Sequence, residues 1–249
     1  MKLPTLDQRI DACRKPVGRQ QILYQKWRDL LFLHWEFPVD VIQRTLPDGL
    51  NVDTYDGKAY LGLVPFFMRD IRPRFCPTVP GVSNFLEMNL RTYVYDRTGK
   101  PGVWFYSLDA DQWLAVRVAR TFFNLPYFDA AMSADKDDGI EYKVIRKGCS
   151  AEFASHLFYS EREELPPPQP GSFEFFLIER YYLFAVNHAG ALFSGKVYHT
   201  PYPLRAVAAE VLKNGAVALA GFDRPDRPPD HAVMSRGVDV NIFAIEKVS

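Results

Sequence analysis

The stretch Gly102–Phe128 reads GVWFYSLDADQWLAVRVARTFFNLPYF and combines the signals of a strand, a helix and a turn. The apolar run from Val103 to Leu108 is typical of a strand, and Gln112 to Phe123 has apolar residues at helical spacing. Asn124-Leu125-Pro126 then ends the helix. The stretch therefore predicts a strand that leads directly into a short helix. The predicted buried stripe of that helix consists of Ala115, Val118, Ala119 and Phe122.

The rest of the chain predicts a mostly β protein. Apolar and aromatic residues gather in runs bounded by Gly, Pro, Asn and Asp. The predicted strands are Asp29–Trp35, Lys58–Arg72, Phe85–Tyr95, Gly102–Asp109, Glu141–Lys147, Ala151–Tyr159, Tyr181–Val186, Ala191–His199, Arg205–Leu212 and Val238–Lys247. Turn residues at 55–57, 97–100 and 187–190 indicate hairpins. We expect a curled or closed antiparallel sheet with a few peripheral helices, an α+β fold dominated by strands.

Besides the helix from Gln112, two helices are predicted, at Val39–Thr45 and at Ser172–Arg180 with Ser172 as N-cap. The polar, proline-rich segment Glu161–Gly171 predicts a stiff surface loop rather than a domain linker. No change of composition along the chain marks a domain boundary, so residues 1–249 are expected to form a single domain.

Composition limits the classes of partner. Apolar residues make up 47% of the 249 residues, enough for a sizeable core, and thirty basic side chains balance thirty acidic ones. This balance predicts a small-molecule ligand and argues against nucleic acid or a membrane as partner. Three widely spaced cysteines and the lack of a signal peptide predict a soluble, cytoplasmic protein.

Common catalytic and cofactor motifs are absent. The sequence has no glycine-rich nucleotide-binding motif, no G-x-S-x-G nucleophile elbow and no H-E-x-x-H metal-binding motif. No cofactor is therefore predicted, and the catalytic residues stay unknown. His34-Trp35-Glu36 matches half of a zinc deaminase site, but the P-C-x-x-C half is missing. The five histidines never fall at metal-binding spacing, so no metal site is expected.

A polar face follows one predicted strand. In Phe85–Tyr95, period 2 places Glu87, Asn89 and Arg91 on the same side. A solvated sheet face is one interpretation. The other interpretation is that this face lies in a barrel interior. There the planar guanidinium of Arg91 would bind a ligand carboxylate, and Glu87 would orient Arg91 or act as acid or base.

The next strand adds two polar side chains. Period 2 groups Ser107 and Asp109 on one side, beside the polar face of the preceding strand. Capping of the following helix is the alternative role for these residues. Arg69, Arg72 and Arg74 lead into a loop at 75–81, which is expected to be either a pocket lid or an ordinary surface loop.

Several motifs carry a resemblance to a known family. In order along the chain they are WRDLLFLHW at 27–35, LPDGL at 46–50, YDGKAYLGLVPF at 55–66, LRTYV at 90–94, GVWFYSLD at 102–109, LPYF at 125–128 and ERY at 179–181. Together they resemble the uncharacterised YqjF-like proteins over almost the whole chain.

That family is in turn similar to acetoacetate decarboxylases. The similarity implies a β-cone fold with a central cavity, and it matches Arg28 to an active-site arginine of those enzymes. Decarboxylases need a lysine amine with a lowered pKa. Here the positions that match the paired lysines are Thr121 and Phe122. Schiff-base chemistry at that position is therefore excluded.

Three hypotheses follow. The first is a protein that binds a small anionic or keto-acid-like molecule, with or without acid–base catalysis, at Arg28, His34, Glu87, Asn89, Arg91, Ser107 and Asp109. The second is a decarboxylase or aldolase-like enzyme with a displaced lysine, at Lys58, Lys143 or Lys196. The third is a non-catalytic oligomeric scaffold, for which a homo-oligomer is expected.

Overall fold

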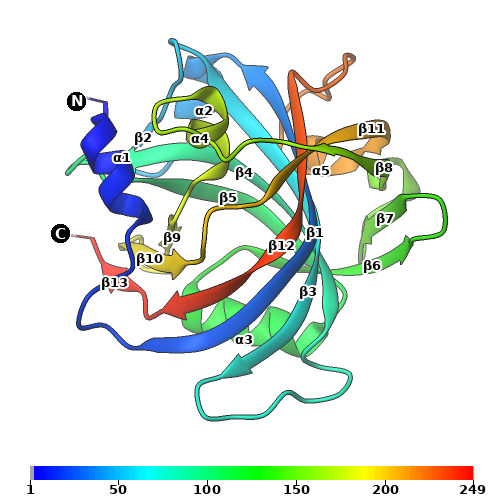
Figure 1. The fold of residues 1–249 in the computed structure, drawn as a ribbon, viewed down its shortest axis with the longest axis horizontal. Helices are drawn as coiled ribbons and strands as arrows, with labels where there is room; N and C mark the ends of the chain where they lie inside the picture. The colour runs from blue at the N-terminus through cyan, green and yellow to red at the C-terminus, as the bar shows by residue number, and fades with distance from the viewer. Residues whose placement is uncertain (1–2, 249) are drawn as a thin grey trace.

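The computed structural model describes residues 3–248, and its strands form one sheet around which short helices pack (Figure 1). The strands are β1 Gln21–Phe37, β2 Leu50–Val52, β3 Ala59–Pro73, β4 Phe85–Asp96, β5 Pro101–Ala110, β6 Tyr127–Asp135, β7 Ile140–Arg146, β8 Ser155–Glu164, β9 Tyr182–Val186, β10 Leu192–Tyr198, β11 Leu204–Asn214, β12 His231–Phe243 and β13 Glu246–Lys247. The helices are α1 Leu6–Cys13, α2 Val39–Gln43, α3 Trp113–Phe123, α4 Phe173–Ile178 and α5 Gly215–Leu219, with a 3₁₀ turn at Ala151–Phe153.

The sheet closes on itself twice. Strands pair in the order β13-β10-β9-β5-β6-β7-β8-β11-β12-β1-β3-β4-β2, and additional pairings join β10 to β12 and β5 to β4. One closed ring therefore runs through β4, β5, β9, β10, β12, β1 and β3, and we call it the first ring. A second ring runs from β5 through β6, β7, β8 and β11 to β12 and shares β1, β3 and β4 with the first. The prediction of a mostly β, closed sheet is confirmed, although β5 pairs in parallel with β6 and with β9.

Each ring encloses its own apolar core. Phe32, Tyr93 and Val233 belong to the core of the first ring, whereas Leu33 and Leu90 belong to the core of the second. Neighbouring residues of a strand point to opposite faces, so each shared strand supplies both cores. Strand β4 is consequently buried on both faces. A solvated polar face on this strand, one of the two interpretations of its sequence, is wrong.

Every predicted strand segment contains strand structure, whereas several shorter elements escaped the sequence patterns. Strand β6 contains the weak strand formers Ala131, Ala134 and Asp135, and it is ordered by pairing with β5 and β7. Helix α1 was also not predicted. Its start is a capping box in which Thr5 and Gln8 exchange side-chain and backbone hydrogen bonds.

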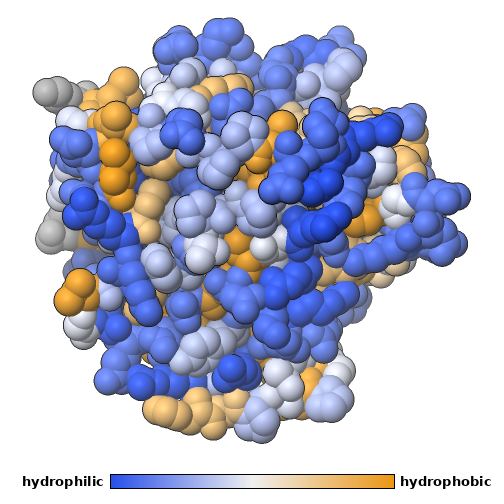
Figure 2. Space-filling model, in the orientation of Figure 1, coloured by the Kyte–Doolittle hydropathy of each residue, from blue (hydrophilic) through white to orange (hydrophobic). Residues whose placement is uncertain are grey.

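The described surface is mainly hydrophilic on the face in view, with scattered apolar groups and a paler apolar stretch along the lower rim, near the loop between β3 and β4 (Figure 2). Among residues 3–248, no helix is long and apolar enough to cross a membrane.

Candidate functional site

Strand β4 places three polar side chains in the interior of the first ring. Glu87, Asn89 and Arg91 expose only 2%, 6% and 8% of their surface. Their alternation along the strand is the pattern that the sequence predicted. Met88 and Leu90 point to the other face, into the second core.

The Arg91 guanidinium is buried mainly against aromatic rings. Its centre lies 5.6 Å from the ring centroid of Phe32 and 5.7 Å from that of Tyr93. One terminal nitrogen is 3.4 Å from the carbonyl oxygen of Leu177 in α4, a long hydrogen bond. Within residues 3–248, Arg91 forms no ion pair. A buried cation is therefore left without a carboxylate partner.

One nitrogen of this guanidinium and one neighbouring polar atom lack hydrogen-bond partners. They are Nε of Arg91 and Oδ1 of Asn89, both buried and without a hydrogen bond in the described structure. Buried polar groups are nearly always paired, and an unpaired one costs about 1–3 kcal/mol. Nε of Arg91 and Oδ1 of Asn89 are thus two unsatisfied polar atoms in the interior of the first ring.

A chain of three side chains continues the polar interior. The Tyr93 hydroxyl lies 2.7 Å from Nε2 of His34, and Nδ1 of His34 lies 2.9 Å from Nδ1 of His231. Burial, reinforced by the neighbouring His231, lowers the pKa of His34 well below 6.5. Burial likewise lowers the pKa of His231 to about 4. Both rings are thus neutral at pH 7, and His34 lies in the interior as the sequence predicted.

Glu87 does not pair with Arg91, which corrects the expectation that this carboxylate orients the guanidinium. Its Oε2 instead accepts a hydrogen bond of 3.0 Å from the Tyr127 hydroxyl. Burial raises the pKa of Glu87 to about 8, against the opposing effect of that hydrogen bond. Glu87 is consequently protonated at neutral pH, the state that a general acid requires.

A bulge in β5 removes Ser107 and Asp109 from this interior, which is a second correction. Leu90 pairs with Ser107, but Arg91 pairs with Phe105, so Tyr106 is an extra residue. Beyond that bulge Asp109 pairs opposite Met88, on the second-ring face. There its carboxylate binds Arg146 through contacts of 2.7 and 3.0 Å. Ser107 is buried with its hydroxyl unpartnered. Asp109 is therefore a structural ion-pair partner.

A bulge in β1 removes Arg28 as well. Trp27 and Leu30 both contact the first core although two residues lie between them. Asp29, the extra residue in the pairing with β3, has a φ of 50°. Arg28 therefore points outward, where its guanidinium lies 2.5 Å from Asp239 and the arginine side chain is 34% exposed. It cannot contact a ligand near Arg91.

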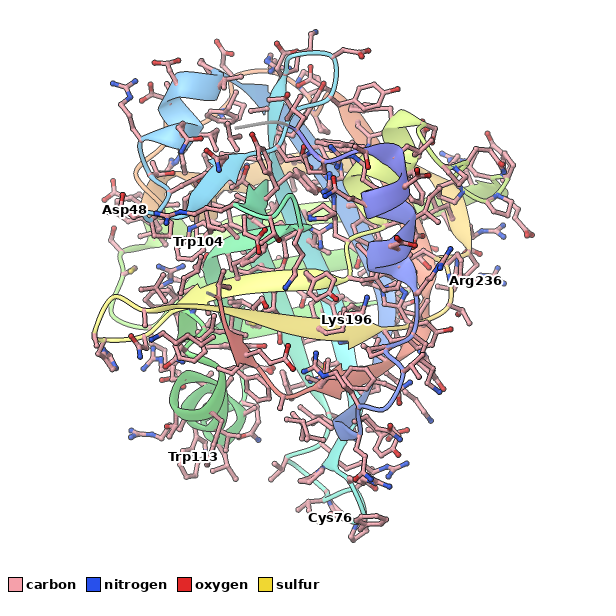
Figure 3. All side chains as sticks on the ribbon, turned by 90° about the vertical axis from the view of Figure 1, so that its left-hand side faces the viewer. Asp48, Cys76, Trp104, Trp113, Lys196 and Arg236 are labelled. Atoms are coloured by element: carbon pink, nitrogen blue, oxygen red, sulfur yellow. The ribbon has the colours of Figure 1, made fainter. Side chains whose placement is uncertain are left out.

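One of the three lysines considered from the sequence is buried, at a position beneath α1. Lys196 of β10 is 2% exposed, and its ammonium donates to the carbonyl of Ala12 in α1 (Figure 3). It lies over the Tyr182 ring at 4.5 Å, and it forms no ion pair with any residue from 3 to 248. Burial lowers the pKa of Lys196 to about 8. Its strand was predicted, but its burial depends on α1, which was not.

The other lysines considered from the sequence are exposed. Lys58 forms a surface ion pair with Glu36, and Lys143 one with Glu141. Lys143 also lines an open hollow of about 360 Å³ along β6, β7, β8 and β11. Thr121 and Phe122 lie on the exposed side of α3, so these positions do not face the first core.

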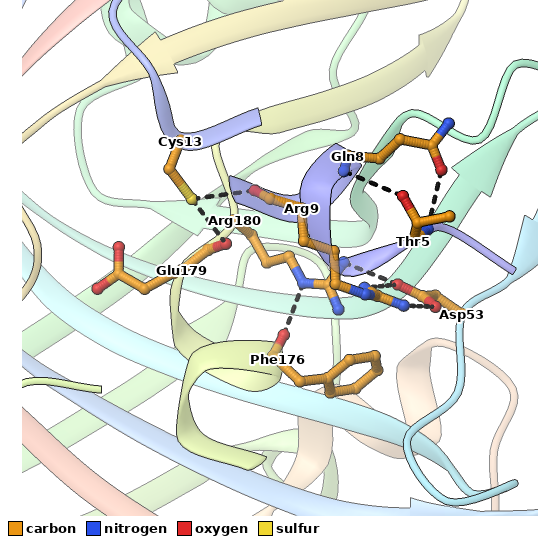
Figure 4. Close-up of polar contacts among 8 residues, drawn as sticks. All are labelled: Thr5, Gln8, Arg9, Cys13, Asp53, Phe176, Glu179 and Arg180. Carbon is orange, nitrogen blue, oxygen red and sulfur yellow. Dashed lines mark hydrogen bonds and ion pairs between the residues drawn. The ribbon is translucent and has the colours of Figure 1, made fainter. Parts of the chain in front are cut away.

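Helix α1 is held over the sheet by a buried carboxylate (Figure 4). Asp53 is fully buried and accepts two hydrogen bonds from Arg9, at 2.6 and 2.7 Å, and one of 2.8 Å from Arg180. Beside this network lies a cavity of about 10 Å³, lined in part by Ala12, Glu179 and Tyr181. A cavity of that size has room for about one water molecule.

One histidine near Lys196 and Arg91, His199, was not predicted as a site residue. His199 stacks on Tyr181 with ring centroids 4.4 Å apart, and its Nε2 has no partner in the described structure. Burial lowers the pKa of His199 to about 4. No group of three or more His, Cys, Asp or Glu side chains within residues 3–248 is arranged to hold a metal ion.

Known proteins resemble this chain at two levels. At low sequence identity, the fold matches acetoacetate decarboxylase from Legionella pneumophila with a TM-score of 0.63 and 12% identity, covering 95% of this chain and 91% of that one. A second acetoacetate decarboxylase structure matches with a TM-score of 0.62, 12% identity, and coverage of 96% and 97%. The enduracididine biosynthesis enzyme MppR in complex with pyruvate gives a TM-score of 0.61, 11% identity, and coverage of 94% and 93%.

Sequence similarity is stronger for one curated protein. The uncharacterized protein YqjF of Bacillus subtilis is 39% identical over 209 residues, which cover 84% of this chain and 85% of that protein. The model of DUF2071, described as an uncharacterized conserved protein (COG2071), matches residues 24–239. The chain therefore belongs to the DUF2071 family of uncharacterised conserved proteins, and it has an acetoacetate decarboxylase-like fold.

Proposed function

We propose that the protein binds a small anionic molecule, of the monocarboxylate or keto acid class, inside the first ring, with Arg91 as its anion-binding group. The observation that carries this proposal is the buried Arg91 guanidinium, which has no carboxylate partner within residues 3–248. Burial of an uncompensated charge costs several kcal/mol, and an anionic ligand offsets that cost. The planar fork of arginine suits the two oxygens of a carboxylate.

The neighbours of Arg91 define the rest of the binding site. Asn89 supplies an unpartnered amide oxygen, which accepts a hydrogen bond from a hydroxyl or enol of the ligand. The neutral His34 and Tyr93 add polar atoms next to the guanidinium without adding charge. The aromatic rings of Phe32 and Tyr202 pack edge to face, and Phe32 lies beside the guanidinium.

Glu87 gives this site a group for proton transfer. Its pKa of about 8 keeps the carboxyl protonated at neutral pH. The pyruvate complex of MppR supports the ligand class, because MppR has a similar fold. Three free cysteines among the described residues support the expectation of a cytoplasmic protein.

Calorimetric titration of the purified protein with pyruvate and with acetoacetate tests the proposal. We expect saturable binding, and a loss of at least about tenfold in affinity for Arg91→Lys, which keeps the charge but removes the fork. Arg205→Lys is the matched control, because Arg205 is a half-buried arginine that already pairs with Glu161. Equal affinities for the parent and Arg91→Lys would refute the role of Arg91, provided that both proteins unfold at the same temperature.

A second function is favoured by Lys196. Its buried amine, with a pKa of about 8 and no ion-pair partner in residues 3–248, has the properties of a carbonyl-reactive lysine. The neutral amine attacks a ketone, water leaves, and an imine results. This hypothesis keeps the displaced-lysine enzyme as an alternative to simple binding.

Borohydride trapping separates the two functions. With pyruvate present, the enzyme hypothesis predicts a reduced covalent adduct on Lys196 that disappears in Lys196→Met. The exposed Lys143 is the internal control for non-specific modification. If Lys196 stays unmodified while pyruvate still binds in the titration, the imine hypothesis is refuted and the binding function stands.

A further inference from the structure

One end of the molecule carries exposed apolar side chains among arginines. Helix α3 and the loop between β3 and β4 both lie at this end, as the positions of Trp113 and Cys76 show (Figure 3). The side chain of Gln112, at the start of α3, donates a hydrogen bond to the carbonyl of Gly81 in the loop. The two segments therefore form one continuous surface, which we call the Trp113 face.

The apolar residues of α3 point to solvent. Phe122 is 67% exposed and Trp113 is 59% exposed, while Leu114 and Val118 complete a stripe at intervals of four residues. Val116 is the buried residue of this helix. The prediction that Val118 and Phe122 belong to a buried stripe is therefore wrong. An amphipathic helix normally turns such a stripe to the core.

The loop adds two apolar side chains at the same end. Phe75 is 88% exposed and adopts a φ of 66°, and Val79 is 50% exposed. An exposed aromatic side chain held in left-handed backbone is costly for the isolated molecule. The whole face thus presents three aromatic and three aliphatic side chains to solvent: Phe75, Trp113 and Phe122 with Val79, Leu114 and Val118.

Within the two segments 71–85 and 112–125, the charged side chains have one sign. Residues 71–85 and 112–125 contain no Asp or Glu, but they contain Arg72, Arg74, Arg117 and Arg120. Within residues 3–248, none of these four arginines forms an ion pair. The overall charge balance, from which no membrane partner was expected, hides this local excess.

We propose that the Trp113 face docks on an anionic lipid surface. Tryptophan and phenylalanine insert at the boundary between headgroups and acyl chains, and arginines beside them bind lipid phosphates. A second copy of this chain fits less well, because a symmetric contact would bring like-charged arginines together. Docking leaves the interior around Arg91 unchanged, so this proposal is independent of the proposed function.

Flotation of the full chain with lipid vesicles tests the proposal. We expect binding to vesicles of phosphatidylcholine with phosphatidylglycerol, little binding to phosphatidylcholine alone, and weaker binding at high salt. Phe122→Ser removes an aromatic anchor and is expected to reduce partitioning about tenfold or more. Arg117→Glu is expected to have an effect of similar size.

Matched controls are available elsewhere on the surface. Leu212→Ser changes an apolar side chain that is 49% exposed on β11, and Arg162→Glu reverses an exposed arginine on β8. Neither is expected to alter vesicle binding. The proposal is overturned if the parent protein does not bind anionic vesicles, or if the control variants bind them as weakly as Phe122→Ser does. It is also overturned if ultracentrifugation finds a dimer that Phe122→Ser dissociates, because a second copy then covers the face.

Discussion

The Nδ1 atoms of His34 and His231 lie 2.9 Å apart, so one ring must donate a hydrogen at this position and the other must accept it. Protonation of both rings would place two N–H groups against each other in a buried environment. The pair is therefore stable only while at least one ring stays neutral. This relationship makes the interior of the first ring sensitive to acid.

The first prediction is a loss of stability in acid. In the unfolded chain His231 binds a proton near pH 6.5, whereas in the fold its pKa is about 4. The unfolded state thus binds more protons between these values, and the free energy of unfolding falls as the pH drops from 6.5 towards 4. His231→Gln should remove on the order of 3 kcal/mol of this pH dependence at most. Urea unfolding at pH 7 and pH 4.5 measures it, with the exposed His188→Gln as control. Parallel pH profiles for the parent and His231→Gln would contradict the prediction.

The second prediction concerns the opposite end of the pH scale. Glu87 has a pKa of about 8 in the fold and an ordinary pKa of 4.5 in the unfolded chain, so the folded state holds the extra proton between these values. Stability therefore falls as the pH rises from 4.5 to 8. Glu87→Gln cannot ionise and should gain stability relative to the parent as the pH is raised to 9, by up to a few kcal/mol. Thermal unfolding at pH 6 and pH 9 gives the comparison, and the exposed Glu210→Gln serves as control. A constant difference between parent and variant at the two pH values would show that Glu87 is already ionised.

The third prediction separates the two faces of β4 and β5. Asp109→Ala leaves Arg146 without its carboxylate, and both side chains are largely buried. The loss should be about 3 kcal/mol of unfolding free energy. The exposed pair of Asp40 and Arg44 supplies the control, because Asp40→Ala should change stability by less than about 0.5 kcal/mol. Since Asp109 faces the second ring, folded Asp109→Ala should bind pyruvate as the parent does. If folded Asp109→Ala lost pyruvate binding, Asp109 would have to be counted among the ligand-binding residues.

The fourth prediction concerns the attachment of α1. Asp53→Ala leaves Arg180 buried and unpaired and frees Arg9, with an expected cost of about 3–5 kcal/mol. Trypsin should then cleave faster after Arg14 or Arg19, between α1 and β1. Asp11→Ala breaks only an exposed pair with Arg14 and should leave the cleavage rate unchanged. Equal rates for Asp53→Ala and the parent would mean that apolar packing alone holds the helix.

The sequence by itself determined most of the strand segments and the polar pattern of β4. Apolar runs between turn residues predicted ten segments, and each of them contains strand structure. Period 2 placed Glu87, Asn89 and Arg91 on one face of β4. These features are local, because a strand alternates wherever its pairing is regular. The family motifs are local too, and they identified the family without knowledge of the contacts.

Only the tertiary structure decided which polar residues share the interior. The bulges at Asp29 and Tyr106 each add one residue to a strand, and one added residue reverses the face of every residue beyond it. The side chains of Arg28 and Asp109 therefore point away from the interior of the first ring. A bulge depends on the register with the neighbouring strand, which no run of the sequence records. The burial of Lys196 under α1 likewise depends on segments more than 180 residues apart in the chain.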